Sequence, residues 1–321
     1  WAKSSFRPKK IISMQSVTEC YSKVKKDCFR YIASQETRTE KFKNKDKMIK
    51  SFLIPVSFYI ANRANKEKTM IVGLAGGQGT GKTTISSIIK MILEKYFKFN
   101  VFKISIDDFY KTRKDRLKLS KNIHPLLMTR GVPGTHDIKL IVDFFKKVLK
   151  RKFSPISLPK FDKSIDDRVR RQNWYKIKKK PNIVILEGWC VGSSAQKLKN
   201  LRKPINSLEK NMDQKLKWRK YVNNQLNSQY KTMHKMLDSF LYLKAKDFSL
   251  LRRWRLKQEK KLSLKNKNKK NSKIMSKNEV LNFMMTYQRI TEHMFKEVPK
   301  FASMVLTLNQ NHQIKNIKYK K

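Results

Sequence analysis

The sequence has 321 residues and a formal net charge of +52, because 76 Lys and Arg outnumber 24 Asp and Glu. Hydrophobic residues make up 39% of the chain and aromatic residues 11%, which is enough for a folded core and argues against a disordered tail of this charge. The longest apolar stretch, Phe52 to Ala61, is about half of the roughly 20 residues that a membrane span needs, so no membrane span is predicted.

The hydrophobic pattern then predicts strands that alternate with helices. Residues 1–66 are expected to form a Lys-rich helical extension. Short apolar runs at 69–75, 101–106 and 182–186 are typical of buried parallel strands, and helical spacing follows at 83–96 and 138–149. Such alternation predicts βαβ units, so residues 67–321 are expected to form an α/β domain with a parallel sheet flanked by helices.

The C-terminal half has a different pattern. Residues 197–261 have helical spacing rich in Trp, Tyr and Leu, and Ser276 with Glu279 predicts the start of a helix that runs to His293. A Lys- and Asn-rich low-complexity loop, 265–273, separates these segments. The runs 302–308 and 313–319 are expected to pair as a terminal hairpin.

The strongest motif is the glycine-rich segment after the first predicted strand. Residues 76–83 read GGQGTGKT and fit the phosphate-binding pattern G-x4-G-K-S/T, although a plain glycine-rich turn is the alternative. Glycines let backbone N–H groups turn onto phosphate oxygens, and the next helix directs its positive end there. The nucleotide site is therefore expected to comprise Gly76, Gly77, Gln78, Gly79, Thr80, Gly81, Lys82, Thr83 and Thr84.

Carboxylates follow the other two predicted strands. Asp107 and Asp108 end the second strand and Glu187 ends the third, where side chains face the ligand crevice of an α/β sheet. Asp107 is the candidate catalytic base, with a helix N-cap as the alternative. Glu187, with Thr83, is the candidate Mg²⁺ position, with a surface turn as the alternative.

Two loops concentrate unlike polar groups in a way that suits a small hydroxylated or carboxylate substrate. The first, RGVPGTHD at 130–137, could equally be a loop capped by Asp137, and the second, PKFDKSIDDR at 159–168, could be a solvated charged loop. The substrate-binding candidates in them are Arg130, His136, Asp137, Lys163 and Arg168.

The cysteines and the first residues of the sequence indicate the cellular compartment in which the protein is expected. Cys20, Cys28 and Cys190 form no CxxC pair, so a reducing compartment, by default the cytoplasm, is expected. Transit peptides are poor in acids and Glu19 is the first acid here, which keeps the plastid stroma as an alternative. A start at Trp1 rather than Met indicates a fragment or a processed end.

The positive charge is mostly lysine, scattered through every segment with many Asn and Ile. This pattern is typical of a genome biased toward A and T, whereas nucleic-acid readers depend on Arg for bidentate base contacts. A small-molecule partner is therefore expected and nucleic acid is the less favoured one, since no helix-turn-helix, zinc or RNA-binding signature is present.

Taken in order, these motifs resemble the D-glycerate 3-kinase family of plants, cyanobacteria and fungi, which is related to uridine kinase, phosphoribulokinase and pantothenate kinase. The motifs are GGQGTGKTT, SIDDFY, RGVPGTHD, PKFDKSIDDR and LEGWCVG, and the resemblance covers roughly Ile54 to Leu308. One departure is Phe161, where family members often carry Tyr.

The resemblance implies the phosphate-loop NTPase fold with ATP and Mg²⁺ as cofactors. It implies that Asp107 is the general base, that Lys82 and Thr83 hold phosphate and magnesium, and that the region of about 197–298 is a helical lid. Of the lid arginines Arg252, Arg253 and Arg255, Arg255 is expected to act in catalysis. Phosphorylation of D-glycerate is the leading expectation; a uridine kinase-like or pantothenate kinase-like enzyme and a nucleic-acid-associated NTPase remain the alternatives.

Overall fold

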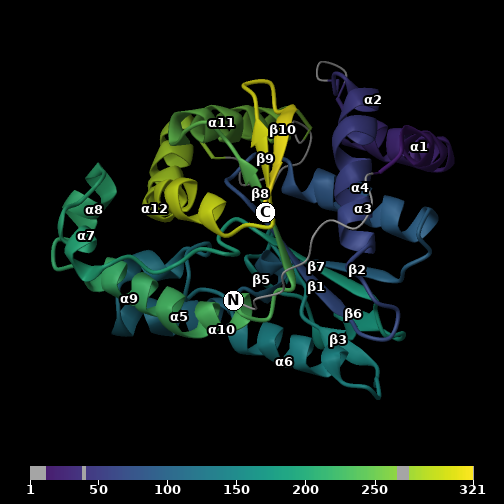
Figure 1. The fold of residues 1–321 in the computed structure, drawn as a ribbon. Coiled ribbons are helices and arrows are strands. Elements are labelled where there is room, and N and C mark those ends of the chain that lie inside the picture. Colours follow the sequence, from purple (N-terminus) through teal and green to yellow (C-terminus); the bar gives the residue numbers. More distant parts are fainter. Residues whose placement is uncertain (1–11, 38–40, 266–274, 321) are drawn as a thin grey trace.

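The computed structural model describes residues 12–37, 41–265 and 275–320. Its centre is a sheet of six strands in the order β10-β9-β8-β1-β7-β2, in which β10 pairs antiparallel and the other pairs are parallel (Figure 1). The strand bounds are Met70–Gly76 (β1), Val101–Ser105 (β2), Ile183–Gly188 (β7), Ser239–Lys244 (β8), Met304–Leu308 (β9) and Ile314–Tyr319 (β10). The predicted α/β fold with a parallel sheet is confirmed.

Helices pack on both faces of this sheet. One core holds side chains from α1 (Met14–Gln35), α3 (Ile54–Ala61), α4 (Lys82–Lys95) and α11 (Phe248–Lys265). The other holds side chains from α6 (Ile138–Leu149), α9 (Lys217–Gln225) and α10 (Lys231–His234), while α12 (Lys277–Glu297) contributes to both. The remaining α-helices are α2 (Lys45–Lys47), α5 (Arg113–Asn122), α7 (Leu198–Arg202) and α8 (Ser207–Met212).

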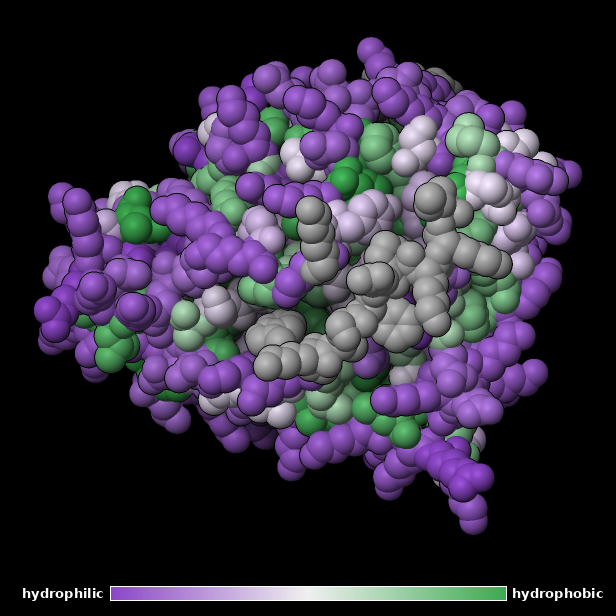
Figure 2. Space-filling model, viewed as in Figure 1, coloured by the Kyte–Doolittle hydropathy of each residue, from purple (hydrophilic) through white to green (hydrophobic). Residues whose placement is uncertain are grey.

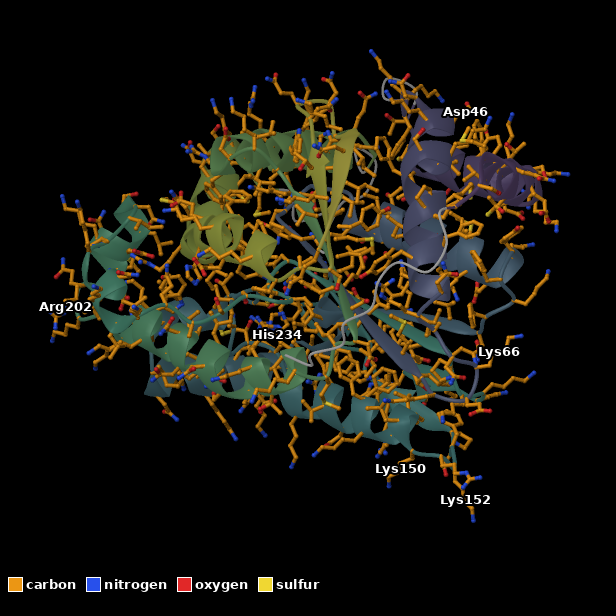
Figure 3. All side chains as sticks on the ribbon, viewed as in Figure 1. Asp46, Lys66, Lys150, Lys152, Arg202 and His234 are labelled. Atoms are coloured by element: carbon orange, nitrogen blue, oxygen red, sulfur yellow. The ribbon has the colours of Figure 1, made fainter. Side chains whose placement is uncertain are left out.

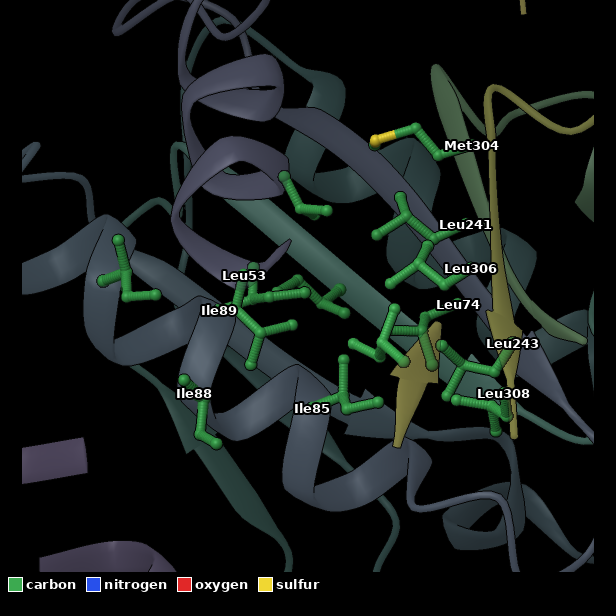
Figure 4. Packing of buried hydrophobic residues seen from close by; sticks show 14 of the residues in the cluster. Leu53, Leu74, Ile85, Ile88, Ile89, Leu241, Leu243, Met304, Leu306 and Leu308 are labelled. Carbon is green, nitrogen blue, oxygen red and sulfur yellow. The ribbon is translucent and has the colours of Figure 1, made fainter. Parts of the chain in front are cut away.

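The N-terminal helices belong to the same core as the sheet. Figure 4 shows Leu53 beside Ile89 of α4, in one cluster with Ile85 of the same helix and, to the right, with Leu241 and Leu306 of the strands. These side chains are almost fully buried, and each stabilises the fold by about 1.5–3 kcal/mol relative to an exposed position. The region expected to be an extension therefore completes one face of the α/β fold.

A π-helical turn, η1 (Met48–Leu53), leads into α3. Pro55 in the first turn of α3 has no N–H and its ring would meet the carbonyl of Ser51, so a regular α-helix cannot continue through this point. The Ile54 N–H instead bonds to the Ile49 carbonyl, which gives the wider turn. The same turn contacts β10, and the rings of Tyr59 and Tyr319 lie 5.6 Å apart.

The structure corrects the helical prediction for 197–261, because β8 lies inside this segment. Its residues Phe240 to Leu243 are all buried, and a short apolar run between helices has no period that separates a buried strand from a buried helix. Two short antiparallel pairs were also not predicted: β3 (Ile156–Leu158) with β6 (Tyr175–Ile177), and β4 (Phe161–Asp162) with β5 (Asp167–Arg168). Positions 266–273 of the expected low-complexity loop lie outside the described residues.

The positive charge is spread over the surface. Figure 3 shows Lys66, Lys150, Lys152 and Arg202 at the periphery, and Figure 2 shows hydrophilic side chains around the rim of the same face. His234 lies inside, where its Nε2 accepts the Gly192 N–H at 2.9 Å and burial lowers its pKa to about 3. Every helix in the described part of the chain is too short or too polar to cross a bilayer.

Candidate active site

The phosphate loop lies between β1 and α4, where the strand delivers it to the end of the sheet. Gly79 and Gly81 have φ of 79° and 83°, a left-handed conformation that glycine adopts without strain. A Cβ on Gly79 would lie 3.0 Å from the Cβ of Trp254, so the loop also packs closely on α11. The Thr80 hydroxyl donates to the Gly77 carbonyl at 2.9 Å, which closes the loop on itself. The first N–H groups of α4 have no partner within the helix, so they suit an anion.

Lys82 is the first residue of α4, and its ammonium lies within the loop. Its Nζ donates to the Gly77 carbonyl at 3.0 Å. Burial lowers the pKa of this ammonium, while the charges of Glu187 and Asp107 oppose that shift. The structure therefore brings the predicted phosphate-binding lysine and the two predicted carboxylates into one electrostatic cluster.

Glu187 at the end of β7 accepts two hydroxyl hydrogen bonds from α4. Thr83 Oγ1 donates to Glu187 Oε1 at 2.9 Å, and Ser86 Oγ donates to Glu187 Oε2 at 2.7 Å. A threonine hydroxyl next to a carboxylate supplies hard oxygen ligands of the kind that Mg²⁺ prefers, and Mg²⁺ keeps waters and takes substrate phosphates for its other positions. The pair therefore fits the ion, although the described residues contain no cluster of three His, Cys, Asp or Glu.

Asp107 lies in a 3₁₀ turn, η2 (Ile106–Phe109), directly after β2. Its Oδ2 accepts a hydrogen bond from Lys163 Nζ at 2.7 Å, and 27% of the Asp107 side chain is exposed. Burial is the largest single influence and would raise the pKa of this carboxyl, but the charge and hydrogen bond of Lys163, with smaller contributions that include the Tyr110 hydroxyl, together lower it. Asp107 is therefore held as a carboxylate, the form that accepts a proton.

Asp108 faces a different environment from its neighbour. Its Oδ1 lies 3.4 Å from the backbone N of Phe161 and 3.4 Å from the Tyr175 hydroxyl, both on the β4 and β6 hairpins. Burial raises the pKa of Asp108 to about 6. Asp108 thus ties the hairpins to η2.

One cleft of about 1120 Å³ unites these groups. We call the part lined by Asp107, Asp108, Lys163 and Glu187 its inner end; the phosphate loop adjoins this part through Lys82 and Thr83. The outer end is lined by part of the N-terminal region, by α11 and by the turn between β9 and β10. Pockets of about 300–1,000 Å³ hold drug-sized ligands, so this cleft has room for a nucleotide and a second small molecule.

Four of the five predicted substrate-binding residues do not line the cleft. Arg130 forms an ion pair with Asp166, which also pairs with the buried Arg116 at 3.0 Å. Arg168 donates from Nε to the Tyr110 carbonyl at 2.8 Å and pairs with Asp137 at 3.3 Å. These contacts hold the β4–β5 hairpin, so Lys163 on the tip of that hairpin is the predicted cation that reaches the cleft.

His136 is also placed behind the cleft. It is fully buried, its ring stacks on Tyr110 with centroids 4.5 Å apart, and its Nδ1 lies 2.6 Å from the Tyr230 hydroxyl. Burial lowers the pKa of His136 to about 4, so the ring is neutral at physiological pH. His136 supports Tyr110, whose own hydroxyl bonds to Asp107, and has no direct route to a substrate.

The predicted lid arginine is likewise engaged elsewhere. Arg255 Nη1 pairs with Glu259 Oε2 at 2.6 Å on the same helix, and Glu259 accepts the backbone N–H of Met275 at 3.0 Å. Glu259 therefore links α11 to the segment just before α12, and Arg255 holds the Glu259 carboxylate in place. The α11 side chains that line the cleft are Trp254, Lys257, Gln258 and Lys261.

Sequence reasoning missed several residues of the site. Ser86 has no motif, but it lies one helical turn after Thr83 and therefore faces the same carboxylate. The sequence predicts the turn at 309–313 only as part of a hairpin, and gives no sign that it lines the cleft. Residues 41–52 offered only a Lys-rich amphipathic pattern, which gave no indication of the cleft.

The anchoring role of Arg168 leads to a stability prediction. Arg168→Met should lower the free energy of unfolding by about 1–3 kcal/mol, because it leaves buried carbonyls and the Asp137 carboxylate without their donor. Urea unfolding measures this, with the exposed Arg170→Met as the matched control. An unchanged unfolding midpoint for Arg168→Met would contradict the assigned role.

The fold and the site are those of a phosphate-loop kinase, and known proteins similar to this chain belong to the same class. The chain is 32% identical over 228 residues to the uncharacterized kinase mug58 of Schizosaccharomyces pombe. The aligned region covers 68% of this chain and 79% of that kinase. It is 29% identical over 199 residues to the chloroplastic D-glycerate 3-kinase of Arabidopsis thaliana, or 59% of this chain and 41% of that protein.

A solved structure of a kinase also resembles this chain. The D-glycerate 3-kinase of Cryptococcus neoformans superimposes with a TM-score of 0.66 at 25% identity, over 83% of this chain and 96% of that chain. A comparison with models of known protein families finds no match. The chain is therefore an ATP-dependent small-molecule kinase. It belongs to the D-glycerate 3-kinase family.

Proposed function

We propose that the protein transfers the γ-phosphoryl group of ATP to a hydroxyl of D-glycerate and forms 3-phosphoglycerate. The observation that carries this proposal is the Asp107–Lys163 pair at the inner end of the cleft, next to Lys82. A hydroxy acid needs a base for its hydroxyl and a cation for its carboxylate, and this pair supplies both. Relatives from a plant and a fungus are D-glycerate 3-kinases, which supports the same substrate.

The residues divide the reaction between them. Asp107 accepts the proton of the substrate hydroxyl as its oxygen bonds to the γ-phosphorus, and the bond from that phosphorus to the β–γ bridging oxygen breaks to release ADP. Lys163 binds the substrate carboxylate. Lys82 and the backbone N–H groups of the loop stabilise the charge that develops on the transferred group.

The Thr83–Glu187 pair is proposed to hold Mg²⁺. When bound, the ion supplies positive charge that offsets the negative charge of the nucleotide phosphates. Glu187 orients the Thr83 hydroxyl, and Ser86 holds the second oxygen of the carboxylate in place. Thr83 and Ser86 are on one face of α4, so the geometry of this pair is set by the helix rather than by a loop.

A substrate panel tests the proposed activity. Wild-type enzyme is assayed with ATP, Mg²⁺ and D-glycerate, uridine, pantothenate or ribulose 5-phosphate, and ADP release is recorded. D-glycerate should give the highest kcat/KM. Faster turnover of uridine or pantothenate would overturn the glycerate assignment and leave the coarser kinase assignment in place.

The ion pair with Lys163 also predicts a shift in pH dependence. Asp107 acts as a base when ionised, so kcat/KM rises as pH passes through its pKa, which Lys163 lowers. Lys163→Met should therefore move the acid limb of the kcat/KM profile to higher pH. It should also raise KM for D-glycerate by about tenfold while KM for ATP changes little.

The matched control for this variant is Lys160→Met, on the same loop but outside the cleft. Lys160→Met should leave both the pH profile and KM for D-glycerate close to wild type. An unshifted acid limb in Lys163→Met would show that Asp107 is not the group that titrates.

A further inference from the structure

The outer end of the cleft contains a wall that belongs to the N-terminal region. Phe42, Met48 and Phe52 line the cleft there, and each is partly buried against the main core. The same end of the cleft is also lined by Trp254 of α11 and by the turn at 309–313 between β9 and β10. Nothing in the reaction described above uses this end.

Trp254 fixes the outer end relative to the phosphate loop. Its Cβ is the neighbour that a side chain on Gly79 would meet at 3.0 Å. Its ring stacks on His312 with centroids 4.0 Å apart and planes at 29°, and its Nε1 donates to the Gln310 carbonyl at 3.1 Å. The β9–β10 turn therefore keeps a set position beside the loop that holds the phosphates.

The N-terminal wall is held equally firmly. The Phe42 N–H donates to Glu36 Oε1 at 2.8 Å, and Lys45 pairs with the same oxygen at 2.7 Å. Lys261 of α11 donates to the Gln35 carbonyl at 3.0 Å, which joins α11 to the end of α1. Met48 and Phe52 lie on the π-helical turn that Pro55 imposes, and π-helical turns occur frequently at functional sites.

The chemistry of this end suits a flat heterocycle. Aromatic and apolar side chains bury ring faces, and the backbone and amide groups of the β9–β10 turn match the polar edge of a base. A nucleotide whose phosphates lie on the loop and whose γ-phosphoryl group points to Asp107 extends its base in the opposite direction, toward this end.

We propose that residues 41–52 form one wall of the base subsite of the nucleotide, so that the N-terminal region is part of the active site. This inference rests on the proposed kinase function and adds a role for a segment outside the phosphate-loop motifs. Adenosine, rather than the phosphate chain, is the part of the ligand that contacts this wall.

ADP and pyrophosphate are the probes, since pyrophosphate occupies the loop without a base. In calorimetry on the full chain, Phe42→Ala and Phe52→Ala should raise Kd for ADP by roughly two- to tenfold and leave Kd for pyrophosphate unchanged. Phe153→Ala is the matched control, because Phe153 is also partly buried but packs on the other core, outside the cleft, and it should leave both values unchanged.

Hydrogen exchange on the wild-type chain tests the same point without a substitution. ADP should slow amide exchange in peptides that cover residues 41–52, and pyrophosphate should not. Equal protection by both probes, or variants that weaken both equally, would overturn this inference alone. Failure of the wild-type chain to bind pyrophosphate would overturn the proposed function and this inference with it.

Discussion

Asp107→Asn is expected to lower kcat for D-glycerate by about 10²–10⁴, the loss typical when a positioned base is removed. Asparagine keeps the shape and the contact with Lys163 Nζ, but its amide cannot accept the proton of the substrate hydroxyl. The affinity for ATP should change little because the phosphate loop is untouched. Steady-state measurement of ADP release gives both quantities.

Asp108→Asn is the matched control for that variant. The Asp108 carboxyl contacts the Phe161 backbone and the Tyr175 hydroxyl, contacts that an asparagine oxygen can also accept, and burial raises its pKa to about 6. Its replacement should cost much less activity. If Asp108→Asn proves the more damaging of the two, Asp107 is not the base.

Lys82→Ala should abolish detectable turnover, with a loss of at least about 10²–10³ in kcat from the missing charge on the transferred phosphoryl group. The fold should persist, because burial already disfavours the charged form of Lys82 and its loss opens no apolar cavity. Lys95→Ala, at the exposed last turn of the same helix, is the control. Turnover of Lys82→Ala within tenfold of wild type would contradict phosphate transfer at this loop.

The sequence predicts best those elements whose residue types and order allow a single local structure. The loop at 76–84 needs its glycines, a strand before it and a helix after it, and Asp107 and Glu187 must meet because parallel strands end at one edge. Their proximity to Lys82 therefore follows from order along the chain. The strand β8 was missed because its apolar run, Phe240 to Leu243, is too short to show a period of its own.

The basic residues of the two polar loops could not be sorted by sequence. Arg130, Arg168 and Lys163 have the same charge and lie in two loops of similar composition, and only their tertiary partners distinguish them. Arg130 pairs with Asp166 and Arg168 pairs with Asp137, whereas Lys163, on the β4–β5 turn, lines the cleft. The partner of each charge lies on another element, so composition and spacing hold no information about it.

The contact between η1 and β10 has a consequence for biosynthesis. These two segments lie far apart in the sequence, so the face that α4 and the N-terminal helices share is incomplete until β10 has been made. At roughly 5–20 residues per second, tens of seconds separate the synthesis of η1 from that of β10. We therefore expect Leu53 to pack first on α4, which is made soon after it, and the contact with β10 to form last on this face.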